Sequence, residues 1–309
     1  MQDYTVNILL ATYNGGRFLR EQLNSLAQQT YQSWTLLISD DGSSDNTLSI
    51  VEAFSREISQ PLEIIQGPQR GSTHNFFHLL QQTNNTRRNQ LFAFCDQDDV
   101  WLPNKLAEAV SWHQRSENQQ GRLYCSATQY VDEHLQVLRP SPSLKRTPSF
   151  GNALVQNIAS GNTMVFDGQV LLGLSRIKAE HSVWHDWTTY LVATALGGQV
   201  FLNNSPSTLY RQHSQNVIGS NHGIKAQLRR LIPLWRGRYR QWCDANVAAM
   251  ADLGDLMSQA SRQCLEDFQR IRHSPYLHQR LRLLSNTNIR RQTLSANLSL
   301  FMAVALQKI

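Results

Sequence analysis

The first hundred residues alternate between short apolar runs and stretches of helical spacing. Runs rich in β-branched and aromatic residues predict strands, and apolar residues three or four positions apart predict the helices between them. The predicted strands cover residues 5–11, 34–39, 62–66 and 91–95, and the predicted helices cover residues 17–29, 46–54 and 72–82. Strands that alternate with helices in this way are typical of right-handed βαβ units. The pattern therefore predicts a mostly parallel sheet with a ligand-binding crevice at the carboxyl ends of its strands.

The pattern becomes less regular after residue 100. Helices are expected at about 102–114 and 188–196, strands at 122–131, 136–138, 164–166 and 199–202, and polar loops at 139–149 and 210–217. From residue 224 onward, leucines alternate with arginines and aromatic residues, which predicts at least three more helices. We therefore expect an α/β domain over residues 1–222 and a basic helical region over residues 223–309.

Charge is distributed unevenly between these two parts. Residues 1–224 contain 15 Lys and Arg against 18 Asp and Glu, whereas residues 225–309 contain 14 against 5. A basic helical region with Trp and Leu is typical of a contact with an anionic membrane surface. A helical bundle that packs on the first domain, with its charges in water, fits the same composition. Charge alone would also suit nucleic acid, but no nucleic-acid-binding module accompanies it, so we expect no nucleic acid partner.

The sequence has no pattern of a secretion signal or a membrane span. The longest apolar candidate, residues 298–306, is much shorter than the roughly 18 residues that cross a bilayer. Four cysteines are scattered without a C-x-x-C pair, which indicates reduced thiols rather than a zinc or redox site. We expect a cytoplasmic protein. The basic region could attach it peripherally to the inner face of the cytoplasmic membrane.

Three carboxylates follow the predicted strand at 91–95. Asp96, Asp98 and Asp99 lie within four positions, and like charges this close are costly to bury unless a cation compensates them. Carboxylate oxygens on a loop suit Mg²⁺ or Mn²⁺, which takes one or two of them and completes its shell with phosphate and water. The alternative is an Asp-rich helix cap, with Asp99 as the capping residue.

Two further polar loops follow predicted strands. One begins at Thr12, and the other runs from Asp40 to Asp45. Because the carboxyl ends of parallel strands lie at one edge of a sheet, we expect these loops and the Asp cluster to converge on one crevice.

Together, segments 11–14, 39–45 and 94–101 resemble the family 2 glycosyltransferases of the GT-A fold. Segments 161–164, 185–187 and 210–216 are similar to the bacterial rhamnosyltransferase-like branch, which builds surface polysaccharides. The resemblance covers about residues 5–220. It implies a GT-A (Rossmann-like) α/β fold, a mostly parallel sheet flanked by helices, with a C-terminal helical appendage. The nucleotide-sugar half would span about residues 1–100, and the acceptor half about residues 101–222.

The resemblance also implies a role for each candidate residue. Positions that match contacts to the nucleotide-sugar are Thr12, Tyr13, Asn14, Asp40, Asp41, Asp96 and Gln97. The matching metal positions are Asp98 and His213, the general base is Asp186, and the acceptor-side positions are Gly161, Asn162 and Trp187. Without the resemblance, Asp186 would be interpreted as a helix cap and His213 as a surface group.

These residue types suit one chemistry. Displacing a nucleoside diphosphate from an anomeric carbon needs a cation at the leaving phosphate and a carboxylate that takes a proton from the attacking hydroxyl. We therefore expect a metal-dependent (Mg²⁺ or Mn²⁺) inverting glycosyltransferase, with dTDP-rhamnose as the candidate donor and a growing, lipid-linked surface glycan as acceptor. A UDP-hexose or hexosamine donor is the alternative within this mechanism. A noncatalytic nucleotide-sugar-binding or scaffold protein of an assembly complex is the alternative from another class.

Overall fold

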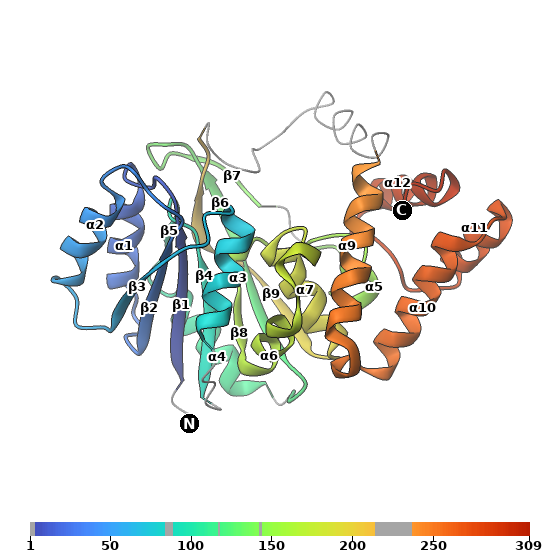
Figure 1. Ribbon diagram of the computed structural model, residues 1–309, viewed down its shortest axis with the longest axis horizontal. Helices are drawn as coiled ribbons and strands as arrows, with labels where there is room; N and C mark the ends of the chain where they lie inside the picture. The colour runs from blue at the N-terminus through green and yellow to red at the C-terminus, as the bar shows by residue number, and fades with distance from the viewer. Residues whose placement is uncertain (1–3, 84–88, 117, 142–143, 214–236) are drawn as a thin grey trace.

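A computed structural model describes residues 4–83, 89–116, 118–141, 144–213 and 237–309. One sheet runs through the first part of the chain with helices on both of its faces, and the last helices lie together at the opposite end of the molecule from α1 and α2 (Figure 1). Among these residues, no helix is long and apolar enough to span a bilayer.

The strands of the sheet follow the predicted positions closely in the first half. They are β1 (Thr5–Thr12), β2 (Trp34–Asp40), β3 (Leu62–Gln66), β4 (Gln90–Cys95), β5 (Val100–Trp101), β6 (Arg122–Val131), β7 (Val137–Pro140), β8 (Val165–Asp167) and β9 (Gln199–Arg211). The loop predicted at 139–149 begins as the end of β7. Residues 142 and 143 of that loop lie outside the described residues.

Most helices connect strands of the sheet. They are α1 (Leu19–Ala27), α2 (Thr47–Ser55), α3 (Ser72–Gln82), α4 (Lys105–Arg115), α5 (Phe150–Ala153), α6 (Gly168–Arg176) and α7 (His185–Ala195). Short 3₁₀ turns are formed by Gly161–Thr163, Ala179–His181 and Gly254–Leu256. The C-terminal helices are α9 (Arg238–Leu253), α10 (Gln259–His273), α11 (Leu277–Ser285) and α12 (Leu294–Ala305).

The strand order is β3-β2-β1-β4-β8-β6-β9-β5, with β7 beside β6. The pairs β1–β2, β2–β3 and β1–β4 are parallel, as the alternating pattern of the first hundred residues predicts. Beyond β4 the sheet is mixed, because β8 runs antiparallel to both β4 and β6 while β9 runs parallel to β6. A three-residue strand such as β8 leaves no sequence signal of its direction. The mostly parallel expectation thus holds for β1 to β4, whereas the rest of the sheet is mixed.

Strand β9 is much longer than predicted. It continues through polar residues to Arg211, whereas the sequence predicts a strand at 199–202 and a loop from residue 210. Pairing with β6 supplies the backbone partners that keep this polar segment extended. As a result, the end of β9 lies beside the Asp cluster that follows β4, since Arg211 contacts Asp98 and Asp99.

The sheet separates two hydrophobic cores. One lies under α1, α2 and α4, and the other lies under α3, α6 and α7 and continues into the C-terminal helices. In α9, Tyr239 is buried and donates from its hydroxyl to the carbonyl of Val155 at 3.0 Å. The ring of Trp242 packs 5.1 Å from that of Trp184. Tyr239 and Trp242 of the basic region therefore pack on the first part of the chain. The predicted boundary at residue 222, and the predicted helix start at 224–235, lie outside the described residues.

Candidate active site

The loops after β1 and β4 are joined by one side chain. The Oε1 atom of Gln97 accepts hydrogen bonds from the Thr12 hydroxyl at 2.7 Å and from the Tyr13 N–H at 2.9 Å. The Nε2 atom of Gln97 donates to the Tyr13 carbonyl at 3.1 Å. The Tyr13 ring itself is 57% exposed. These contacts hold the first strand's loop against the Asp cluster and leave an aromatic ring free to stack on a flat ligand.

The loop after β2 is shaped by its own carboxylates. Asp40 accepts hydrogen bonds from the N–H and hydroxyl of Ser43, at 2.9 and 2.5 Å. Asp41 accepts from the N–H groups of Gln69 and Gly71, at 2.6 and 2.8 Å. Both carboxylates are buried. Their oxygen atoms therefore fix the loop beside the first one.

Asn14 ties the loops after β1 and β2 together. Its N–H donates to the Ser43 hydroxyl at 2.8 Å, and its Oδ1 accepts from the Ser44 N–H at 2.9 Å. Asn14 has a φ of 47°, a left-handed conformation that Asn tolerates better than most residues. Together with Gln97, it makes the three loops one connected surface.

Asp99 is a buried support of the cluster. It is fully buried, and its carboxylate accepts hydrogen bonds from the Arg211 N–H, at 3.0 Å, and from the side-chain amide of Asn162. Burial raises the pKa of Asp99 well above its usual range, and the charges of Asp98 and Asp96 add to the shift. Asp99 is not the helix cap considered as an alternative. Its carboxylate oxygens accept hydrogen bonds from Arg211 and Asn162, which are far along the chain.

Asp98 and His213 lie side by side. His213 Nε2 is 2.8 Å from Asp98 Oδ2, and both side chains are largely buried. No group of three or more His, Cys, Asp and Glu residues in the described ranges is arranged to hold a metal by itself. One carboxylate oxygen and one imidazole nitrogen nevertheless fit a Mg²⁺ or Mn²⁺ ion that takes its other ligands from a diphosphate and water.

Asp96 and Asp186 lie close enough for their charges to interact. Both carboxyl groups are surrounded by protein, yet each residue keeps part of its surface exposed. Burial, followed by the charges of Asp98 and Asp186, raises the pKa of Asp96 to about 7. Burial raises the pKa of Asp186 to about 6, although hydrogen bonds, including the 2.6 Å bond from the Trp187 N–H, oppose the shift. Burial therefore makes Asp186 a stronger base than an exposed carboxylate, as proton transfer near neutral pH requires.

His185 belongs to the core rather than to the reacting groups. Its ring stacks on Phe76 with 3.8 Å between centroids and lies edge-on to Phe94 at 4.8 Å. Burial lowers the pKa of His185 to about 3, so the ring is neutral. This agrees with a structural role for His185.

The residues expected on the acceptor side are all buried. Asn162 is fully buried and donates to Asp99, and the indole N–H of Trp187 donates to the Ala153 carbonyl at 2.7 Å. Gly161 lies next to Asp186, whose carboxyl accepts a hydrogen bond from the Gly161 backbone. Asn162 and Trp187 therefore support neighbouring segments from inside the protein, and Gly161 contacts Asp186 directly.

Two buried cations beside the cleft were not predicted from the sequence. The Nζ atom of Lys105 lies over the Trp101 ring, 4.3 Å from its centroid, and donates to the Asn162 carbonyl and to the Thr208 hydroxyl. Burial lowers the pKa of Lys105 to about 7. The second cation is Arg211.

Arg211 holds the Asp98 loop from behind. Its guanidinium donates to the carbonyls of Asp98, at 2.9 Å, and Glu133, at 2.5 Å, and to the carboxylate of Glu21 at 2.5 Å. Its side chain is 1% exposed. Because three separate segments are fixed by one side chain, Arg211 sets the position of the loop that carries Asp98.

We expect Arg211→Met to lower the free energy of unfolding by about 2 to 4 kcal/mol, because buried carbonyls lose a charged donor. Urea denaturation measures this change. Arg17→Met is the matched control, since Arg17 is 61% exposed and pairs with the same residue, Glu133. Equal stability of the two variants would contradict the role given to Arg211.

We also expect Gly161→Ala to destabilise the site. An added Cβ would lie 2.4 Å from His185 Nε2, and the stacked His185 ring has no room to move away. Overpacking of this kind costs about 1 to 3 kcal/mol. In a His185→Ala background, Gly161→Ala should lower the free energy of unfolding much less. Thermal unfolding of the unmodified protein, the two single variants and the double variant measures this difference. Equal costs in both backgrounds would exclude the steric explanation.

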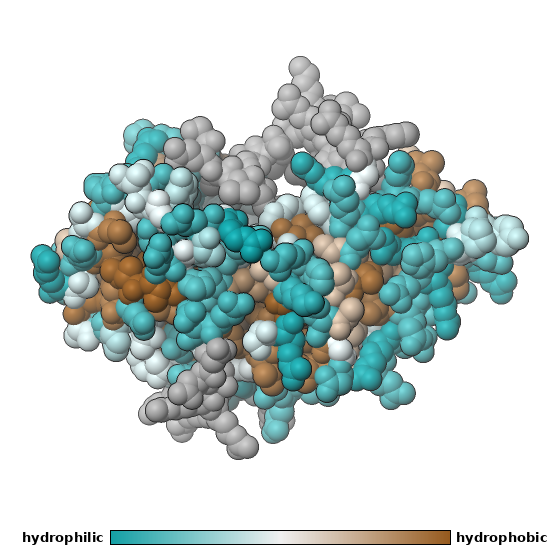
Figure 2. Space-filling view, viewed as in Figure 1, coloured by the Kyte–Doolittle hydropathy of each residue, from teal (hydrophilic) through white to brown (hydrophobic). Residues whose placement is uncertain are grey.

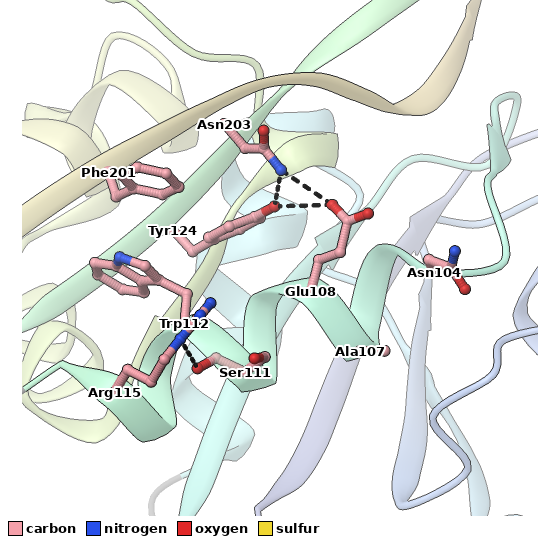
Figure 3. Close-up of a pocket in the computed structure, with 9 residues that line it drawn as sticks. All are labelled: Asn104, Ala107, Glu108, Ser111, Trp112, Arg115, Tyr124, Phe201 and Asn203. Carbon is pink, nitrogen blue, oxygen red and sulfur yellow. Dashed lines mark hydrogen bonds between the residues drawn. The ribbon is translucent and has the colours of Figure 1, made fainter.

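A separate pocket of about 400 Å³ lies between α4 and the strands β6 and β9 (Figure 3). Glu108, Tyr124 and Asn203 hydrogen-bond to one another there, and the rings of Trp112 and Phe201 stack at 5.7 Å. None of the residues predicted for the site lines this pocket.

The sheet order, with three joined loops and an acidic cluster at the carboxyl ends of β1, β2 and β4, defines a glycosyltransferase fold of the GT-A type. The family model described as Glycosyl transferase family 2 matches residues 7–168. The chain belongs to this family and is a glycosyltransferase.

Comparisons with individual proteins agree with this assignment. The dTDP-rhamnosyl transferase RfbG of Shigella flexneri is 26% identical over 251 residues, which cover 79% of this chain and 85% of RfbG. The Escherichia coli enzyme WfgD, named as a UDP-Glc:alpha-D-GlcNAc-diphosphoundecaprenol beta-1,3-glucosyltransferase, is 33% identical over 115 residues, or 36% of this chain and 42% of WfgD. Residues 1–349 of S. aureus TarS, in complex with UDP-GlcNAc, share the fold, with a TM-score of 0.59 and 16% identity over 91% of this chain and 80% of that one.

Proposed function

We propose that this glycosyltransferase uses a nucleotide-sugar donor and a divalent metal ion, and that it inverts the anomeric configuration. The arrangement of carboxylates carries the proposal. Asp98 and His213 lie side by side and would hold the metal ion, whereas Asp186, on another segment, interacts with Asp96, which in turn interacts with Asp98. The leaving diphosphate needs a positive charge beside it, and the attacking hydroxyl needs a base. These two partners must act on opposite sides of the sugar.

The donor would be held by the three joined loops. Tyr13 offers an exposed ring to the base, and Thr12, Asn14, Asp40 and Asp41 shape the loops beside it. Asp96 and Gln97 lie where the ribose would enter. A Mg²⁺ or Mn²⁺ ion held by Asp98 and His213 would supply positive charge to the donor's diphosphate.

Asp186 would act as the general base. It forms no ion pair with any described residue, so its charge is not neutralised by a neighbour. Its pKa near 6 suits proton transfer from an acceptor hydroxyl at neutral pH. Attack from the side of Asp186, away from the leaving diphosphate, inverts the anomeric carbon.

Rhamnose is the proposed sugar, with dTDP-rhamnose as donor. The similarity to RfbG supports it because that similarity extends over 79% of the chain, past Asp186 and into the acceptor half. A UDP-hexose donor is the second candidate, which the shorter similarity to WfgD favours. The WfgD name also contains a diphosphoundecaprenol acceptor, which supports a lipid-linked glycan as the acceptor here. We place the protein in the cytoplasm, peripheral to the membrane where such an acceptor lies.

A donor panel tests the proposal. The full chain is incubated with dTDP-rhamnose, UDP-glucose or UDP-GlcNAc, with Mg²⁺, Mn²⁺ or a chelator, and release of nucleoside diphosphate is followed. We expect metal-dependent release from one donor, with dTDP-rhamnose preferred. Binding of a donor without any turnover would favour the noncatalytic alternative instead.

The pH dependence should have an acid limb near pH 6. Burial raises the pKa of Asp186, so the base is protonated and inactive below that pH and ionised above it. With saturating donor, kcat should fall about ten-fold per pH unit below 6 and level off above it. Asp186→Glu should shift the limb, whereas Tyr13→Phe should leave it in place. A limb that does not respond to Asp186→Glu would assign the titration to another group.

A further inference from the structure

Helix α12 presents large apolar side chains to solvent. Leu294 is 83% exposed, Leu298 is 64% exposed and Met302 is 50% exposed. Phe301 and Leu306 are exposed on the same side, because spacings of four, seven and eight residues fall on one helix face. We call these five residues the apolar stripe.

The other face of α12 is packed against the protein. Leu300, Ala303 and Val304 are buried there, and the helix contains no charged residue. The helix is therefore fixed by one face while its second apolar face has no partner among the described residues. A continuous apolar face of five exposed side chains is unusual on a soluble protein unless it binds a partner or a membrane.

The start of α11 extends this surface. Arg280 donates to the carbonyl of Ala305 at 3.0 Å, which places the first turns of α11 beside the end of α12. Tyr276 and Leu277, just before Arg280, are both about half exposed. Hydrophobic residues reach the surface at this end of the molecule (Figures 1 and 2).

The charge around the stripe has a single sign. Residues 268–309 contain seven Arg and Lys and no Asp or Glu. Arg272 is paired with Asp244 of α9. Arg282, Arg290 and Lys308, in contrast, form no ion pair with any described residue. The apolar stripe is thus accompanied by positive charges that no acidic side chain among the described residues pairs with.

We propose that the apolar stripe inserts into the surface of an anionic membrane, with α12 lying in the plane of the interface. The apolar face of an interfacial helix inserts at the boundary between the lipid headgroups and the acyl chains, and nearby cationic side chains pair with lipid phosphates. A second copy of this chain would bring the same positive charges together, which disfavours self-association. This inference rests on the proposed lipid-linked acceptor and names the surface that would bring the enzyme to it.

The structure connects α12 to the active site. The segment between α11 and α12 docks on α5, where Asn152 donates to the Arg290 carbonyl at 2.7 Å and Arg291 donates to the Val155 carbonyl at 3.2 Å. The carbonyl of Ala153 in α5 accepts the indole N–H of Trp187, the neighbour of Asp186. A membrane bound at α12 would therefore lie at a fixed place relative to the general base.

The test is sedimentation of the full chain with vesicles of phosphatidylcholine alone, or with about one third phosphatidylglycerol. We expect binding to the anionic vesicles only, weakened by salt. Replacing Leu298 and Phe301 with Gln should lower the partition coefficient about ten-fold or more. Replacing Arg282, Arg290 and Lys308 with Gln should lower it by roughly five-fold per charge. Leu172→Gln, on α6 and 45% exposed, is the matched apolar control and should bind normally.

Several results would overturn the inference. Absence of binding to anionic vesicles by the unmodified chain is one, and normal binding by the Leu298 and Phe301 variant is another. Light scattering that shows an oligomer, dissociated by the same variant, would assign the stripe to self-association. Donor turnover in solution is measured in parallel, with thermal unfolding to establish folding. Turnover without vesicle binding contradicts only this inference, and vesicle binding without turnover contradicts only the proposed function.

Discussion

Asp186→Asn should lower sugar transfer by about two to four orders of magnitude, the usual contribution of a positioned base. The amide keeps the size of the carboxylate and can still accept the hydrogen bond from the Trp187 N–H, so the start of α7 should stay in place. It cannot take a proton from the acceptor. Donor binding should change little, because Asp186 accepts its hydrogen bonds from Trp187, Asn157 and Gly161 rather than from the loops that carry Tyr13 and Gln97.

The measurement is the initial rate of transfer at saturating donor, with donor affinity and melting temperature recorded for the same protein. Glu180→Gln is the matched control, since Glu180 is an exposed acid shortly before α7 that pairs with Arg70 at the surface. It should transfer at the normal rate. Near-normal transfer by Asp186→Asn would place the base elsewhere in the cleft.

Asp98→Asn should have the second large effect. The amide can keep the contact with His213, but it removes the negative charge that a divalent cation needs. We expect transfer to fall by at least about two orders of magnitude, because the metal's stabilisation of charge on the leaving diphosphate is worth several kcal/mol. The metal concentration for half-maximal rate should rise in parallel.

Titration with Mn²⁺ in the presence of donor measures both effects. Asp255→Asn, at an acidic residue of the C-terminal region far along the chain from the cleft, should titrate like the unmodified protein. In the unmodified protein, a chelator should abolish transfer and added Mn²⁺ should restore it. Full transfer in the chelator would remove the metal from the proposal altogether.

Much of the nucleotide half is predictable because its signals are local. Each strand from β1 to β4 is an apolar run that ends in polar residues, and each helix between them has its own apolar spacing. The loops at Thr12, Asp40 and Asp96 can therefore be assigned to one edge of the sheet from the amino-acid pattern alone. The hydrogen bonds of Gln97 and Asn14, which join these loops, leave no such pattern.

The second half is harder to predict because its structure depends on distant partners. The polar end of β9 is a strand only because β6 lies beside it, and no residue of that end shows the pairing by itself. Burial of Lys105 and Arg211 is likewise invisible in sequence, since most such residues are exposed. The same holds for the burial of Trp187, whose indole N–H donates to the Ala153 carbonyl.

The contact between Arg211 and the Asp98 loop also has a consequence for synthesis of the chain. The two residues are separated by 113 positions, and the loop's other support, the Asn162 amide, follows Asp99 by 63. A ribosome that adds roughly 5 to 20 residues per second would leave the acidic loop without these partners for several seconds. During that interval the nascent sheet can pair β1 with β2 and β4, and Gln97 can bond to Thr12 and Tyr13, but Asp98 and Asp99 still lack their contacts with Arg211 and Asn162. The donor cleft is therefore among the last parts of the catalytic unit to be completed, and a ribosome stalled before β9 would present a sheet without a finished site.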